Sequence, residues 1–200
     1  MAPPTTAERF DQLHAAHRDA IAGYLRRLTR NEALAEDLTQ EAFLRAGRGL
    51  AGFRGESSPS TWIYHIATNV YLDHHRRRAA RGRKAEAGAL PLEDLPDSLI
   101  PSTPAPLLPD RLFEQSEMGS CVREFVDSLP PESRAMIVLH DLQGLTNAEI
   151  ARVFDCSLEN VKIRVHRARQ KLKALLSEHC DFDRDGDDVL RCDRKQPPGD

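Results

Sequence analysis

The chain has 200 residues, of which 40% are apolar and 30% are charged. This composition is typical of a globular protein and excludes a fibrous or low-complexity chain. No apolar run approaches the roughly 20 residues that a membrane-spanning helix needs, and residues 1–10 lack the apolar core of a secretory signal. We therefore expect a cytoplasmic protein with no membrane insertion, whose four cysteines stay reduced.

Positive charge is concentrated locally. The formal net charge is −3, yet residues 76–84 carry six basic side chains and no acid. The last 23 residues hold eight acids against four bases. Such a distribution favours a polyanion partner for the basic segment, with a solvated helix face as the alternative.

Helical periodicity dominates the N-terminal part of the chain. Apolar residues recur at helical spacing over residues 7–29, and a second helix is expected after Asn31. Glycines between residues 47 and 55 interrupt the pattern. A third helix is expected from about Pro59 to Arg78.

The helical pattern fails between residues 80 and 112, where six prolines predict a flexible linker. A second helical unit begins near Leu112, and Pro130–Pro131 is expected to open another helix because proline fits the first turn. The predicted fold is all-α, with two small helical domains joined by the linker and followed by a short acidic tail. The predicted divisions are residues 1–79, 80–112, 113–176 and 177–200.

Residues 146–173 predict a helix-turn-helix. Thr146 and Glu149 have the spacing of a capping box, and a turn is expected at residues 155–157. Every charged residue from 161 to 173 is basic, as suits a recognition helix in the major groove. We expect base edges to be read near the start of this helix, by Ser157, Glu159, Asn160 and Lys162. Phosphates would be bound further along, by Arg164, Arg167 and Arg169.

Three blocks in order resemble one family, the bacterial extracytoplasmic-function (ECF) sigma factors, the smallest of the sigma-70 type. These blocks are residues 35–45 (AEDLTQEAFLR), 53–69 (FRGESSPSTWIYHIATN) and 129–134 (LPPESR), the last followed by the helix-turn-helix. The resemblance covers about residues 8 to 176. It implies a transcription initiation factor with region 2 and region 4 domains and no catalytic residues of its own.

The first block implies contact with core RNA polymerase. Asp37, Gln40 and Glu41 share one helical face, which in the family docks on the clamp helices of the β′ subunit. An ordinary solvated surface is the alternative. Near the C-terminus of region 4, Arg169, Lys171 and Lys173 form either a solvated face or a docking surface for the polymerase β flap.

The second block implies recognition of the minus-10 promoter element. Melting a duplex requires a pocket for an extruded base, and the resemblance assigns this pocket to Arg54, Glu56, Ser57 and Ser58. For Trp62, core packing is the favoured interpretation. Further contacts with minus-10 DNA are expected along the same helix, from Asn69, Asp73, Arg76 and Arg77.

The third block implies that the helix-turn-helix reads the minus-35 element. Here the chain departs from the common family form, which often has Gly-Thr at the positions of Glu159–Asn160 and Ser at Ile163. The promoter sequence therefore cannot be carried over from relatives.

The C-terminal tail is an addition to region 4. No cofactor is required, but His179, Cys180 and Cys192 could supply three ligands to zinc or another transition metal. Cys121 or Cys156 could be a fourth ligand, although the spacing is unspecific. There are two alternatives to metal binding: the acidic tail modulates region 4, or the tail has no fixed structure.

Two other functions stay open on the sequence alone. A polymerase-independent helix-turn-helix regulator would explain residues 146–173 but not the first two blocks. A metal or thiol sensor with a DNA-binding domain would make the tail the primary feature. An anti-sigma factor is a further candidate partner, beside core RNA polymerase and promoter DNA.

Overall fold

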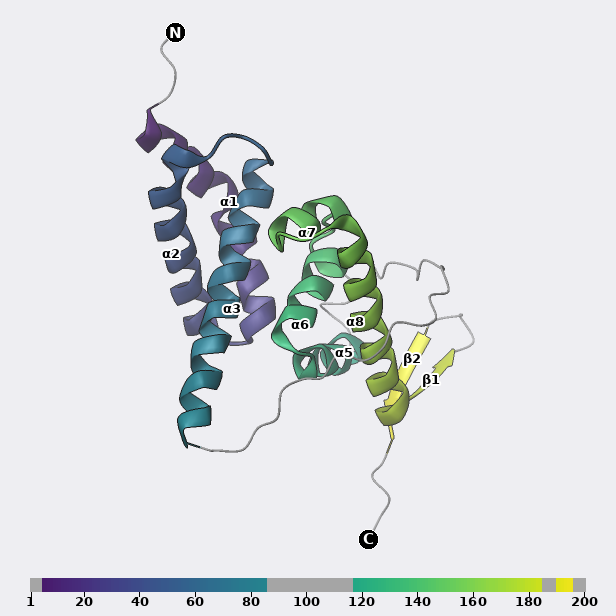
Figure 1. Cartoon of the computed structure of the whole chain (residues 1–200). Helices are drawn as coiled ribbons and strands as arrows, with labels where there is room; N and C mark the ends of the chain where they lie inside the picture. The colour runs from purple at the N-terminus through teal and green to yellow at the C-terminus, as the bar shows by residue number, and fades with distance from the viewer. Residues whose placement is uncertain (1–4, 86–116, 185–189, 196–200) are drawn as a thin grey trace.

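The computed structural model describes residues 5–85, 117–184 and 190–195. The N-terminal half consists of three long helices and a short 3-10 turn (Figure 1): α1 Thr6–Thr29, α2 Glu32–Gly49, η1 Leu50–Gly52 and α3 Pro59–Ala85. Side-chain caps set the first two helix starts. Thr5 and Glu8 form a capping box for α1, and the Asn31 side chain accepts from the Leu34 amide at 2.9 Å to begin α2.

The C-terminal half packs shorter helices around α8 (Figure 1): α5 Glu117–Ser128, α6 Pro131–Ile137, the π-helical turn η2 Val138–Leu142, α7 Asn147–Val153 and α8 Leu158–His179. Pro131 occupies the first turn of α6, where its missing amide hydrogen costs nothing. Thr146 and Glu149 form the predicted capping box of α7. Ser157 caps α8 by accepting from the Asn160 amide at 3.2 Å. The helix-turn-helix is thus α7, the turn and α8.

One apolar cluster joins the two halves of the molecule. It includes Ile21, Leu25, Ile63 and Tyr71 from the N-terminal helices. It continues without interruption into the C-terminal half, through Met136, Val138, Leu139, Ile150, Val153, Val161 and Val165. Burial of this shared cluster holds α1 and α3 against α6, η2 and α7.

The tail forms a two-stranded antiparallel hairpin of β1 Cys180–Arg184 and β2 Leu190–Arg194. The register pairs Cys180 with Arg194 and Phe182 with Cys192. Lys195 closes the hairpin against the end of α8, since its amide donates to the His179 carbonyl at 2.9 Å. This hairpin was not predicted from the sequence.

The helical predictions are confirmed. The helix expected over residues 7–29 is α1, Asn31 caps α2, and Pro130–Pro131 opens α6. The third helix continues past Arg78 to Ala85. The predicted linker, residues 80–112, falls largely on residues 86–116, which lie outside the described residues. Within the described ranges, no helix is long and apolar enough to cross a membrane.

Candidate nucleic-acid and polymerase interfaces

The loop between η1 and α3 holds the first predicted DNA-binding residues. Gly55 has φ +75°, a left-handed conformation that favours glycine and turns the chain sharply. The Ser58 hydroxyl then accepts from the Thr61 amide at 3.0 Å. Ser58 therefore serves as a cap for α3, whereas Arg54 and Glu56 are exposed on the loop.

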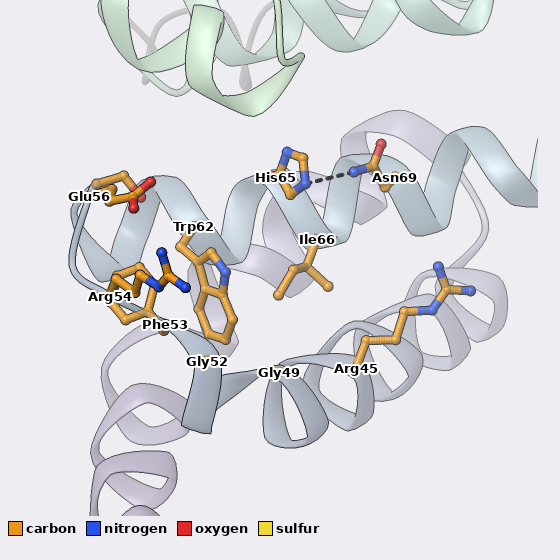
Figure 2. A pocket seen from close by; sticks show the side chains of 11 residues that line it. Arg45, Gly49, Gly52, Phe53, Arg54, Glu56, Trp62, His65, Ile66 and Asn69 are labelled. Carbon is orange, nitrogen blue, oxygen red and sulfur yellow. Dashed lines mark hydrogen bonds between the residues drawn. The ribbon is translucent and has the colours of Figure 1, made fainter.

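An open pocket of 730 Å³ lies between this loop, the end of α2 and one face of α3 (Figure 2). The pocket brings together four of the predicted minus-10 residues: Arg54, Glu56, Ser57 and Asn69. The predicted residues that do not line it are Ser58, Asp73, Arg76 and Arg77. Loop and helix residues distant in the sequence therefore meet at one cavity.

Aromatic side chains form a wall of this pocket. Phe53 and Trp62 are stacked, with ring centroids 4.8 Å apart and planes 30° from parallel. Trp62 is half-buried and packs on the apolar core, and the same ring lines the pocket (Figure 2). A stacked pair at a polar cavity offers a π-face for an unstacked base.

Sequence reasoning missed His65, Ile66 and Arg45 as pocket residues. Positions 62, 65, 66 and 69 follow the i, i+3, i+4, i+7 pattern of one helix face. His65 and Ile66 could therefore have been found from periodicity. Arg45 could not have been, because it comes from the neighbouring helix.

The predicted polymerase face lies on the outer side of α2. Asp37 and Gln40 are exposed, and Glu41 is half-buried. Leu44 lies on the same face and leaves 56% of its surface exposed, a large value for leucine. Glu41 bonds to Arg45, whose Nε lies 2.7 Å from Glu41 Oε1.

Arg45 also reaches α3, the helix of the predicted minus-10 contacts. Its Nη1 lies 3.0 Å from Asp73 Oδ2, and Arg76 Nη2 lies 2.6 Å from Asp73 Oδ1. The hydrogen bond from Arg45 lowers the pKa of Asp73, burial opposes this, and Arg76 adds to the lowering. Asp73 is therefore an anchored carboxylate in this structure rather than a free acceptor.

Several basic side chains of the predicted recognition helix, α8, are paired with carboxylates in the folded protein. Arg164 forms an ion pair with Glu132 of α6, and Lys162 lies 3.7 Å from Glu159. Arg169 binds Asp141 of η2 through Nε at 3.2 Å and through Nη2. These acids are supplied mostly by other elements, so the basic run predicted from residues 161–173 is partly neutralised.

Ser157, Glu159, Asn160 and Lys162 do lie at the start of α8, as predicted for base contacts. Ser157 is committed to capping through its hydroxyl. Arg167 lies further along the same helix and is exposed. Their roles at DNA stay predictions.

The structure places two of the three predicted metal ligands, His179 and Cys180. His179 is exposed and its Nδ1 lies 2.9 Å from the Leu175 carbonyl, whereas Cys180 is buried. The side chain of Cys192 lies outside what the structure describes. Among the described side chains, no group of three or more His, Cys, Asp or Glu could hold a metal ion.

The fold and these surfaces define a class of protein: a predominantly helical protein with a helix-turn-helix and, beside it, a polar, aromatic-walled pocket. Two family models match the chain, sigma-70 region 2 over residues 13–81 and sigma-70 region 4 over residues 120–172.

Curated relatives agree with this class. The ECF RNA polymerase sigma factor SigE of Mycolicibacterium smegmatis is 35% identical over 173 residues, which cover 85% of this chain and 62% of the relative. The RNA polymerase sigma-H factor of Pseudomonas aeruginosa is 31% identical over 171 residues, covering 84% of this chain and 86% of the relative. The chain thus spans less than two thirds of the first relative and most of the second.

Solved structures give the same fold. The sigma factor RpoE in complex with the anti-sigma factor NepR from Bartonella quintana has a TM-score of 0.61 at 20% identity, covering 84% of this chain and 97% of that one. CnrH in complex with the cytosolic domain of CnrY has a TM-score of 0.57 at 27% identity, covering 84% and 88%. The chain belongs to the ECF group of the sigma-70 family.

Proposed function

We propose that this chain recruits core RNA polymerase, reads a minus-10 and a minus-35 promoter element, and captures an extruded base at the minus-10 element. The pocket carries this proposal. It combines stacked aromatic rings with polar side chains able to bond a base edge, which are the two requirements for holding a flipped base. These polar side chains are Arg54, Glu56, Ser57 and Asn69.

The helix-turn-helix supplies the second promoter contact. Glu159, Asn160 and Lys162 lie in the first turns of α8, the part of a recognition helix that contacts base edges. Arg164 and Arg167 lie further along and would bind phosphates, which position the helix without reading sequence. Arg164 would have to exchange its partner Glu132 for a phosphate.

Polymerase would supply the chemistry, and no catalytic residue is assigned to this chain. We place the contact with the β′ clamp helices on the face of α2 that carries Asp37, Gln40 and Glu41, with the exposed Leu44 one turn further along. The acids and the amide suit basic partner residues, and Leu44 adds apolar area. The exposed Lys171 and Lys173 in the second half of α8 would contact the β flap. This activity belongs in the cytoplasm, where polymerase works.

An anti-sigma factor is the proposed regulatory partner. Two proteins with this fold were solved as complexes, RpoE with the anti-sigma factor NepR and CnrH with the cytosolic domain of CnrY. A protein that bound region 2 and region 4 of this chain together would block both promoter contacts.

Run-off transcription with purified core polymerase and a promoter library, with and without this protein, tests the proposal. We expect initiation at a defined subset of promoters only when the protein is present. Arg54→Ala should lower initiation at those promoters about tenfold, as one lost base contact would, while Arg9→Ala at the start of α1 should not. Specific DNA binding without core, together with unchanged initiation, would favour the polymerase-independent regulator.

A further inference from the structure

One isoleucine of α8 lies on the side of the helix opposite to its buried face. The buried face consists of Val161, Val165 and Ala168, which contribute to the apolar clusters. Ile163 lies midway between the two valines in the sequence, which places it about 200° around the helix from Val161, at about 100° per residue. Ile163 is half-buried, and among the described residues it belongs to neither apolar cluster. Its side chain is therefore not explained by packing of the core.

The neighbours of Ile163 on this face are predicted base readers. Residues three and four positions apart lie side by side on a helix surface, so Ile163 adjoins Asn160 and Glu159. Single apolar residues on a protein surface are common. This one, however, lies within the part of α8 that is proposed to enter the major groove, where an apolar side chain has a specific partner.

Thymine is the base whose major-groove edge fits an isoleucine. The four bases present different patterns of donors and acceptors in this groove, and thymine alone adds a methyl group at C5. Ile163 can neither donate nor accept a hydrogen bond, so a base edge without an apolar group would lose water there without a replacement. A thymine methyl instead loses water in contact with another apolar group, which is favourable.

The helix presents this side chain in a defined direction. α8 packs against α5, α6 and α7, and its start is fixed by the Ser157 hydroxyl, which accepts from the Asn160 amide at 3.2 Å. A β-branched residue within a helix has one strongly preferred χ1 rotamer. Ile163 would therefore lose little side-chain freedom when it is ordered against a base.

We propose that Ile163 selects thymine at one position of the minus-35 element by contact with the 5-methyl group. This inference rests on the proposed function, because it requires α8 to enter the major groove of that element. Glu159 and Asn160 would read donors and acceptors, whereas Ile163 reads a methyl group. The preferred element therefore contains a thymine, on either strand, beside the base pairs that Glu159 and Asn160 contact.

Replacing thymine by deoxyuridine tests the contact, because it removes the 5-methyl group and leaves the hydrogen-bonding groups of the base pair in place. The probe is a promoter fragment selected by run-off transcription with core polymerase and this protein. It carries deoxyuridine at one thymine of the minus-35 element at a time. We expect one of these replacements to weaken binding of the holoenzyme about fourfold, as the loss of one buried methyl group would.

Ile163→Ala supplies the other half of a double-mutant cycle. It should weaken binding of the unmodified fragment by a similar factor and should abolish the effect of that deoxyuridine, because the two changes remove the two sides of one contact. Gln170→Ala, at an exposed position further along α8, is the control. This variant should retain the full fourfold effect of deoxyuridine.

Three results would overturn the inference while leaving promoter-specific initiation intact. The first is a selected minus-35 element that contains no thymine. The second is wild-type binding that no deoxyuridine changes, a measurement that needs no variant protein. The third is a deoxyuridine effect of equal size in wild type and Ile163→Ala, since another residue would then contact the methyl group. Absence of any initiation that depends on this protein would instead overturn the proposed function, and this inference with it.

Discussion

Arg45 and Asp73 join the predicted polymerase face to the predicted DNA face, with 3.0 Å between Nη1 and Oδ2. The same guanidinium binds Glu41 on α2 at 2.7 Å. Arg45 is 31% exposed in its side chain, so the network is partly shielded from water. A change at the predicted polymerase face of α2 would therefore reach α3 through the Arg45 side chain.

Arg45→Ala should loosen α3 against α2. We expect a loss of about 1 kcal/mol in the free energy of unfolding, typical of a partly exposed ion-pair network, measured by urea denaturation at neutral pH. Arg48→Ala, at an exposed position of the same helix, is the control and should change little. Equal effects of the two substitutions would show that the bridge contributes no stability.

The stability difference between wild type and Arg45→Ala should depend on pH. The pKa of Asp73 is lowered in the folded protein, first by Arg45, so its contribution is present above the unfolded pKa of about 3.9. It is lost as pH falls through the folded value, because protonation ends the ion pair. The difference measured at pH 7 should therefore shrink in acid, below about pH 4. A difference that stays constant down to pH 3 would contradict the lowered pKa.

The capping box of α7 should matter for the whole helix-turn-helix because α7 has only seven residues. Thr146→Ala removes the hydroxyl that accepts from the Glu149 amide at 3.3 Å. We expect the free energy of unfolding to fall by about 1 kcal/mol. Thr146→Ser retains the hydroxyl oxygen, so its free energy of unfolding should fall much less. Chemical denaturation monitored by circular dichroism would measure both variants, and indistinguishable curves would argue against the cap.

Arg76 and Arg77 should differ in their contribution to DNA binding, although they are neighbours. Arg77 is exposed, whereas Arg76 is bound to Asp73 at 2.6 Å. If Arg77 neutralises a phosphate, Arg77→Ala should reduce the slope of log K against log salt by about 0.9. Arg76→Ala should reduce the slope less because its charge is already paired. Binding of holoenzyme to a promoter fragment over a salt series measures both slopes.

Local chemistry made much of the fold predictable. The caps at Asn31, Thr146 and Ser157 and the proline pair before α6 are short-range signals, and each marks a helix start in the structure. The continuation of α3 beyond Arg78 was missed. Its arginines and alanines carry no apolar stripe but are strong helix formers.

Long-range pairing could not be predicted. Glu132 and Asp141 neutralise arginines 32 and 28 positions later in the chain. Tyr64 meets Gln143 across 79 positions. Such contacts depend on how whole helices pack, which periodicity does not specify. The tail hairpin was missed because its short strands are rich in charge and depart from the usual strand composition.

The most direct test of a bipartite promoter reader is the separation of its two domains during initiation. The measurement is fluorescence transfer between probes at Ala15→Cys in α1 and Gln170→Cys in α8, both exposed positions. It is made first in the free protein and then in the complex with core polymerase and promoter DNA. We predict high transfer in the free protein, where one apolar cluster joins the two halves, and a loss of transfer in the promoter complex, as the domains move apart to reach two separate elements. High transfer retained in a transcriptionally active complex would contradict the account.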